Sequence, residues 1–248
     1  MIDTHIHLDQ LEDAEAQLEE AAGEGVEAVV AVGVDLATSA TALEFARRRP
    51  GVWAAVGHHP LNSSPPDLLA LRALAQDQRV VAVGEVGLDH ADPERGPEAE
   101  QEEWFEACCG LALSLQLPVL VHVRETAEQV LAQLSAHRGL TGVIHYWTLD
   151  WAWAERFLAA GFHISFSGLV TRASRDDLRR IAAALPEDRI LLETDAPWGT
   201  PRGRSGPMRA AWIKSTLEVV AEARGLTPEE MSELEWANAL RLFRRLQR

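Results

Sequence analysis

IDTHIH, residues 2–7, is a short β-branched segment that carries two histidines two positions apart. Seven further apolar, β-branched runs follow it, at residues 26–32, 52–57, 80–84, 119–123, 143–145, 163–166 and 190–193. Amphipathic helical patterns separate many of them, for example at residues 11–22, 43–49, 100–115 and 178–185. This alternation is typical of βαβ units and a parallel sheet. Eight such runs in 248 residues, without a long linker or an internal duplication, predict an α/β protein with a single (β/α)8 TIM barrel.

Two additional helices are expected at the C-terminal end, at residues 208–224 and 229–246. Thr227 would be the N-cap of the second, with Pro228 at its first position. Four large apolar side chains of these helices are expected to pack on the barrel: Trp212, Trp236, Leu240 and Phe243. The sequence has no glycine-rich or Walker-type phosphate cradle, which disfavours a nucleotide-binding open sheet. We therefore expect residues 1–248 to form one domain.

The composition is that of an ordinary soluble protein, with 47% hydrophobic and 25% charged residues. No apolar run approaches the roughly 18 residues of a membrane span, and the start MIDTHIHLDQ lacks the features of a secretory signal. These features predict a cytoplasmic protein without membrane association. The net charge of −15 disfavours tight, non-specific binding along a duplex. A local positive rim is nevertheless expected from a group of arginines, which are Arg172, Arg175, Arg179, Arg180, Arg202, Arg204 and Arg209.

The C-terminal ends of the strands are where a (β/α)8 barrel holds its functional side chains. Here these ends carry residues that ligate metals: His5, His7, Glu85, His122, His145 and Asp195. Strand alternation directs His5 and His7 to the same side. Each residue taken singly has a structural explanation, such as a packed histidine or a helix cap. Six ligands together exceed the three or four of one zinc, so two divalent ions such as Zn²⁺ or Mn²⁺ are predicted, with Glu85 between them.

These residues lie in segments that resemble the TatD family of metal-dependent hydrolases, part of the amidohydrolase superfamily. The similar motifs span nearly the whole chain: DTHIHLD from Asp3, GHHP from Gly57, GEVGLD from Gly84, HVRE from His122, HYW from His145, ISFSGLVT from Ile164 and ETDAP from Glu193. The resemblance implies one ion on His5, His7 and Asp195 and a second on His122 and His145, with Glu85 shared by both. Many amidohydrolases use a carboxylated lysine as the bridge instead. The single lysine of this chain, Lys214, lies in a C-terminal helical pattern, so the count agrees with a carboxylate bridge.

The resemblance also implies phosphodiester hydrolysis, typically by a deoxyribonuclease of the exonuclease type that uses Mg²⁺ or Zn²⁺. Asp195 and Glu85 would then be catalytic, with Asp195 taking the proton of a metal-activated water. Arg124 faces the side of His122 and is placed to clamp a phosphate, or else to pair with Glu125. His59 is expected either to contact substrate or to pack beside its neighbouring proline.

The sequence departs from the family pattern in three places. His90 replaces a common tyrosine and is followed by the acidic insert ADPERGPEAE. Tyr146 and Trp147 replace a cysteine and a phenylalanine. The segment PRGRSGP keeps two expected substrate-binding residues, Arg202 and Arg204, but lacks an asparagine. Trp147 and Trp198 follow ligand positions and would either stack on a nucleobase or close the barrel rim.

Two classes of substrate are compatible with these residues. The first is nucleic acid or a small phosphodiester, which the arginines at positions 124, 202 and 204 favour because they match an anionic phosphate. The second is an ester, amide or lactone, including the ester of aminoacyl-tRNA. The chain is expected to act as a monomer.

Overall fold

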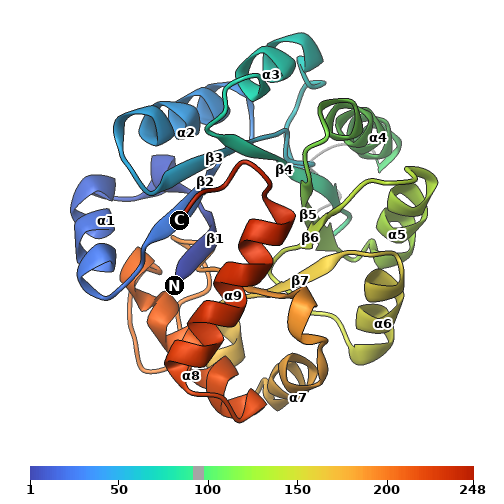
Figure 1. Cartoon of the computed structure of the whole chain (residues 1–248). Helices are drawn as coiled ribbons and strands as arrows, with labels where there is room; N and C mark the ends of the chain where they lie inside the picture. Colours follow the sequence, from blue (N-terminus) through green and yellow to red (C-terminus); the bar gives the residue numbers. More distant parts are fainter. Residues whose placement is uncertain (92–97) are drawn as a thin grey trace.

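The computed structural model describes residues 1–91 and 98–248, so most of the acidic insert after His90 lies outside the described residues. Parallel strands form a nearly closed TIM barrel in which each strand pairs with the next along the chain, as predicted (Figure 1). The strands are β1 (Ile2–Ile6), β2 (Ala28–Val32), β3 (Val52–Val56), β4 (Val80–Asp89), β5 (Val119–Arg124), β6 (Gly142–Ile144), β7 (His163–Phe166) and β8 (Ile190–Leu192).

Helices α1 to α8 follow the strands and cover the outside of the barrel, and α9 comes last in the chain (Figure 1). They are α1 (Ala14–Gly23), α2 (Leu36–Arg48), α3 (Leu68–Ala75), α4 (Glu98–Leu115), α5 (Ala127–Ala136), α6 (Trp151–Ala159), α7 (Asp176–Ala184), α8 (Ile213–Arg224) and α9 (Pro228–Leu242). α2 begins at Leu36 rather than at the predicted residue 43, because Asp35 and Thr38 form a capping box. The Thr38 amide donates to the Asp35 carboxylate at 2.7 Å. This capping interaction satisfies an amide that the helix itself leaves unpaired.

Alternate residues of the strands belong to two separate apolar layers. Val29 and Ala31 of β2 point outward and join Leu43 of α2 in the layer between sheet and helices. Val30 and Val32 point inward and join the core inside the barrel. This separation follows from the two-residue period of a strand. The inner core occupies the end of the barrel that α9 covers, which leaves the opposite end of the strands for polar side chains.

α9 crosses the barrel at the end where both chain termini lie (Figure 1). Trp236 of this helix and Phe243, which directly follows it, are buried in the inner core, as predicted. The prediction that Leu240 packs on the barrel was wrong, since this residue is 38% exposed. The buried stripe of α9 includes Ala239 and Leu242, and this orientation turns Leu240 toward solvent.

Glu235 of α9 joins the first and last strands. Its carboxylate accepts the amide of Ile2 at 3.4 Å and the amide of Leu192 at 3.1 Å. Beyond this point the Asp195 amide donates to the carbonyl oxygen of His5 at 2.8 Å. Residues nearly two hundred positions apart in sequence are thereby adjacent at the strand ends.

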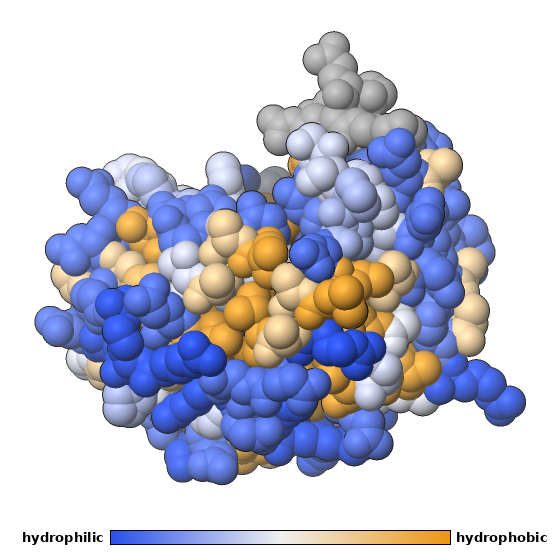
Figure 2. Space-filling view, turned by 90° about the horizontal axis from the view of Figure 1, so that it is seen from above, coloured by the Kyte–Doolittle hydropathy of each residue, from blue (hydrophilic) through white to orange (hydrophobic). Residues whose placement is uncertain are grey.

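The side of the barrel formed by α2, α3 and α4 carries a band of apolar side chains within a hydrophilic surface (Figure 2). Leu69 of α3 is 82% exposed, and Leu36 and Leu113 of the neighbouring helices are partly exposed. Among the described residues no helix combines the length and apolarity that crossing a bilayer requires. This band lies on the outer surface of the barrel.

Candidate metal centre

A first ligand group consists of His5, His7, Glu85 and Asp195 at one end of the barrel. The Nε2 atoms of His5 and His7 lie 3.2 Å apart, and each is 3.6 Å from Oε2 of Glu85. Oδ1 of Asp195 lies 3.3 Å from Nε2 of His7 and 3.7 Å from that of His5. Ligand atoms at about 2.0–2.1 Å around a tetrahedral ion lie about 3.4 Å from one another. The spacing of His5, His7 and Glu85 therefore fits one divalent ion, and Asp195 lies at a similar distance from the two histidines.

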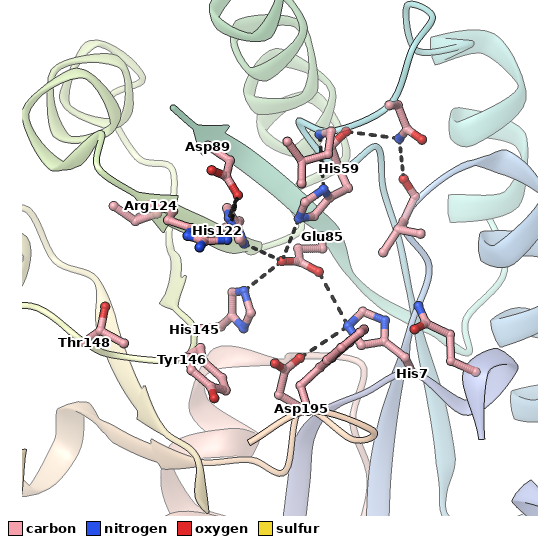
Figure 3. A pocket seen from close by; sticks show the side chains of 16 residues that line it. His7, His59, Glu85, Asp89, His122, Arg124, His145, Tyr146, Thr148 and Asp195 are labelled. Atoms are coloured by element: carbon pink, nitrogen blue, oxygen red, sulfur yellow. Dashed lines mark hydrogen bonds and ion pairs between the residues drawn. The ribbon is translucent and has the colours of Figure 1, made fainter. Parts of the chain in front are cut away.

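A second ligand group surrounds the other oxygen of the same carboxylate (Figure 3). Oε1 of Glu85 lies 2.8 Å from Nε2 of His145, 2.9 Å from Nδ1 of His122 and 3.4 Å from Nε2 of His59. The rings of His145 and His5 stack at 4.1 Å, so the two groups are neighbours. One oxygen of Glu85 thus faces each group, which is the arrangement that a bridging carboxylate requires.

Close backbone packing places Glu85 in this position. β4 continues to Asp89 instead of ending at residue 84, with an irregularity in its pairing with β5 between Val83 and Val86. A Cβ at Gly84 would overlap the side chain of Leu120, and one at Gly57 would overlap the backbone of Gly84 and Glu85. Glycine at positions 57 and 84 therefore allows the strands to approach and the carboxylate to enter the barrel mouth.

Outer hydrogen bonds orient the histidine ligands. Nδ1 of His7 lies 3.2 Å from the carbonyl oxygen of Val32, so it acts as the donor and leaves the Nε2 lone pair directed at the first group. Nε2 of His122 donates to the buried carboxylate of Asp89 at 3.2 Å. Nδ1 of His145 lies 3.5 Å from Glu193, whose carboxylate also accepts the Tyr146 amide at 2.6 Å.

The sequence interpretation assigned no role to Asp89 or Glu193. Both belong to quoted motifs, GEVGLD and ETDAP. Asp89 lies four residues after Glu85, so strand alternation predicts that the two carboxylates share a side. From that spacing, Asp89 could have been predicted to lie near the site. Glu193 lies two residues before Asp195 and carried a similar signal, but only the barrel brings it beside His145.

The buried carboxylates and histidines of the centre shift one another's pKa values. Burial opposes ionisation of Glu85, but the charges of His145 and His59 hold its pKa well below the usual range. Burial likewise opposes protonation of His7, yet its hydrogen bond to Asp195 raises its pKa to about 9. Burial and the charge of His145 lower the pKa of His5. The carboxylates here attract positive charge, which divalent ions on these ligands would supply in place of protons.

Replacement of Asp89 by asparagine tests the orientation of His122. We expect the variant to bind one of two Zn²⁺ ions about 10- to 100-fold more weakly, because His122 loses its anionic acceptor. The measurement is a zinc titration of metal-free protein against a competing chelator. Asp77→Asn is the matched control, since Asp77 pairs with Arg47 at 2.8 Å on the outer surface. Unchanged affinity at both sites would contradict an orienting role of Asp89.

A cavity of about 780 Å³ opens above both ligand groups. Its lining includes Gln10, Asn62, Asp89, Thr148, Tyr146, Trp198 and ligands of both groups. Trp198 is 58% exposed, whereas Trp147 is only 2% exposed and packs against Phe157. The two tryptophans therefore differ: Trp147 belongs to the core, and Trp198 borders the cavity.

The predicted substrate-binding residues lie in different places. Arg124 lines the cavity with a side chain that is 64% exposed, and its Nη1 lies 3.8 Å from Asp89 rather than beside Glu125. His59 lies within the second ligand group. Within the described residues the cavity lining does not include Arg202 or Arg204, and the guanidinium of Arg204 lies 5.4 Å from the ring centroid of Trp212. Their contact with substrate stays a prediction.

Comparison with known proteins gives the family. The model of TatD related DNase matches residues 2–244. The chain is 33% identical over 254 residues to YabD of Bacillus subtilis, named an uncharacterized metal-dependent hydrolase, covering 98% of this chain and 99% of YabD. It is 36% identical over 242 residues to the 3'-5' ssDNA/RNA exonuclease TatD of Cronobacter sakazakii, covering 93% and 92%. The crystal structure of YJJV, a TatD homologue from Escherichia coli K12, superposes with a TM-score of 0.90 at 30% identity and 98% coverage of each chain. This protein belongs to the TatD-related DNase family.

Proposed function

We propose that this protein is a two-metal phosphodiesterase that removes nucleotides from the 3′ ends of single-stranded nucleic acid. The observation that carries the proposal is the position of Glu85, whose two oxygens face separate ligand groups beneath a cavity with Arg124 at its edge. The imidazole-rich ligand set favours Zn²⁺ over Mg²⁺ in affinity, with Mn²⁺ also suited to the carboxylates.

The residues around the cavity have distinct roles in this proposal. Divalent ions held by the two groups would supply an acidified water and positive charge for the phosphoryl oxygens. Asp195 accepts a proton, since its carboxylate faces the first group and borders the cavity. Arg124 binds a phosphate oxygen through its guanidinium, which solvent reaches. His59 lies 3.4 Å from Glu85 and either completes the second group or contacts the substrate.

The substrate class rests on three supports. The TatD relative from Cronobacter sakazakii is named an exonuclease of single-stranded DNA and RNA. Arg124 gives the cavity a permanent positive charge suited to a phosphate. The net charge of −15 disfavours binding along a duplex, so strand ends and short fragments are the substrates that fit best.

A substrate panel tests the function directly. Metal-free protein would be reconstituted with Zn²⁺, Mn²⁺ or Mg²⁺ and assayed on single-stranded DNA, single-stranded RNA, charged tRNA and neutral model esters. We expect stepwise shortening of both single strands from the 3′ end. Cleavage of the esters or of charged tRNA, with intact oligonucleotides, would reject the phosphodiesterase assignment.

Arg124→Ala separates phosphate recognition from general hydrolysis. We expect kcat/KM for an oligonucleotide to fall about tenfold or more, because a charge-assisted hydrogen bond contributes about 1.5–3 kcal/mol. Any activity toward a neutral ester should change much less. Arg180→Ala is the matched control, because Arg180 lies on α7 and pairs with Asp176 at 2.8 Å. Equal losses on both substrates would exclude a phosphate clamp.

A further inference from the structure

Trp198 is a large aromatic side chain with no packing role to explain its position. It is 58% exposed at the edge of the catalytic cavity. Most aromatic side chains of this size bury their area in a core, as Trp147 and Trp236 do at 2% and 1% exposure. An exposed indole beside a cavity for an anionic substrate points to a ligand with its own flat, apolar face.

The backbone ties this indole to the metal centre. The Trp198 amide donates to the carbonyl oxygen of Asp195 at 2.8 Å, which closes a four-residue turn that begins at a metal ligand. The next residue, Gly199, has a φ of 74°, and the ring of Tyr146 lies against it. A side chain at this position would be strained and crowded by Tyr146, at 3.1 Å from its Cβ. The turn therefore fixes the backbone of Trp198 relative to Asp195 at the edge of the cavity.

Three arginines near this turn have no carboxylate partner among residues 1–91 and 98–248: Arg172, Arg202 and Arg204. Arg204 lies over the ring of Trp212, so the two that remain are Arg172 and Arg202. Both are exposed, and the Arg202 amide donates to the hydroxyl of Thr171 at 2.7 Å, so the two positions are adjacent. A Cβ at Gly168 would overlap the carbonyl oxygen of Gly199, so the short segment that leads to Arg172 packs against this turn.

The other arginines of this segment are engaged elsewhere. Arg175 and Arg180 pair with aspartates of α7, and Arg209 pairs with Glu20. Arg179 donates to the backbone carbonyls of Val170 and Arg172. The positive rim that the sequence predicts is thus reduced to one edge beside Trp198.

We propose that one of the two bases flanking the scissile phosphate stacks on Trp198, while Arg172 and Arg202 bind phosphates of the strand on the 5′ side of these two nucleotides. This inference rests on the proposed nuclease function and adds how the strand is held. Inside a duplex both faces of a base are covered by its neighbours, so an indole can stack only on an unpaired, frayed or terminal base. Stacking depends on the ring face, which all bases and both sugars share, so little base preference is expected.

Trp198→Ala and Trp198→Phe test the stacking contact. On a single-stranded 12-mer we expect KM to rise about fivefold or more for the alanine variant and to stay near the wild-type value for phenylalanine, as stacking predicts. The same assay with an abasic site at either of the last two 3′ positions removes the partner ring. At one of these positions the wild type and Trp198→Ala should then give equal KM. An alanine penalty that is undiminished on both abasic strands would overturn the proposal.

A binding assay supplies a readout that is independent of turnover. In the presence of a metal chelator, the 12-mer should quench tryptophan fluorescence of the wild type. Trp198→Phe should bind a labelled 12-mer with similar anisotropy but lose most of that quenching. Quenching that persists in Trp198→Phe would place the contact on another tryptophan and contradict the assignment.

The arginine edge is tested by strand length. The double variant Arg172→Gln/Arg202→Gln should raise KM for the 12-mer but not for a dinucleotide. A plot of the logarithm of its binding constant for the 12-mer against the logarithm of the salt concentration should be less steep, by about 0.7 for each lost phosphate contact. Arg180→Gln is the control. Equal effects on both lengths would exclude the edge as a backbone contact. If the wild type cleaves no oligonucleotide, both the nuclease function and the stacking on Trp198 are rejected. If the wild type cleaves oligonucleotides and Trp198→Ala has the same KM, only the stacking on Trp198 is rejected.

Discussion

Replacement of Glu85 by glutamine is expected to reduce the metal content from two ions per chain to one or fewer and to lower turnover of an oligonucleotide by about 10³-fold or more. Each oxygen of Glu85 faces a different ligand group, at 3.6 Å from His5 and 2.8 Å from His145. The amide keeps the size of the side chain but loses the charge and one of the two oxygens. Loss of a bound ion removes several kcal/mol of transition-state stabilisation, which corresponds to a factor of this size.

The measurement combines elemental analysis of the purified variant with its kcat. Glu128→Gln is the matched control, because Glu128 is an exposed partner of Arg156 on the outer helices and should keep both metals and activity. Circular dichroism verifies that the variant is folded. A folded Glu85→Gln protein that retains two ions and normal turnover would disprove the bridge.

Asp195→Asn is expected to separate metal binding from hydrolysis. The asparagine retains an oxygen for the first group, 3.3 Å from His7 in the native carboxylate, so most of the metal should remain bound. The amide cannot accept the proton that a general base takes, and such bases contribute typically about 10²- to 10⁴-fold to the rate. We therefore expect kcat to decrease by that factor while KM for the oligonucleotide changes little.

Kinetics and elemental analysis on the same preparation test this expectation. Asp188→Asn serves as the control, since Asp188 pairs with Arg189 on the surface. Turnover close to that of the wild type would reject Asp195 as the base. A parallel loss of metal and turnover would instead assign it to ligation alone.

Local sequence patterns determined the architecture of this protein. β-branched runs that alternate with amphipathic stretches predicted the strands, and only β4 was substantially longer than expected. The meeting of His5, His7, His122, His145 and Asp195 could be predicted because every parallel strand of a barrel ends at the same mouth. Topology alone therefore brings together residues that are distant in sequence, without knowledge of any side-chain contact.

Contacts between elements that are distant in sequence determined the burial and the partners of several side chains, which local patterns did not specify. Trp147 and Trp198 both follow a ligand closely, yet one is buried against Phe157 and the other borders the cavity. His59, which was expected either to contact substrate or to pack beside its neighbouring proline, lies 3.4 Å from Glu85, and Arg124 is nearer Asp89 than Glu125. Arg204 stacks over Trp212 outside the cavity lining. The strand period specifies which side a residue faces, but its burial, partner and distance depend on neighbouring elements, which only the folded barrel places beside it.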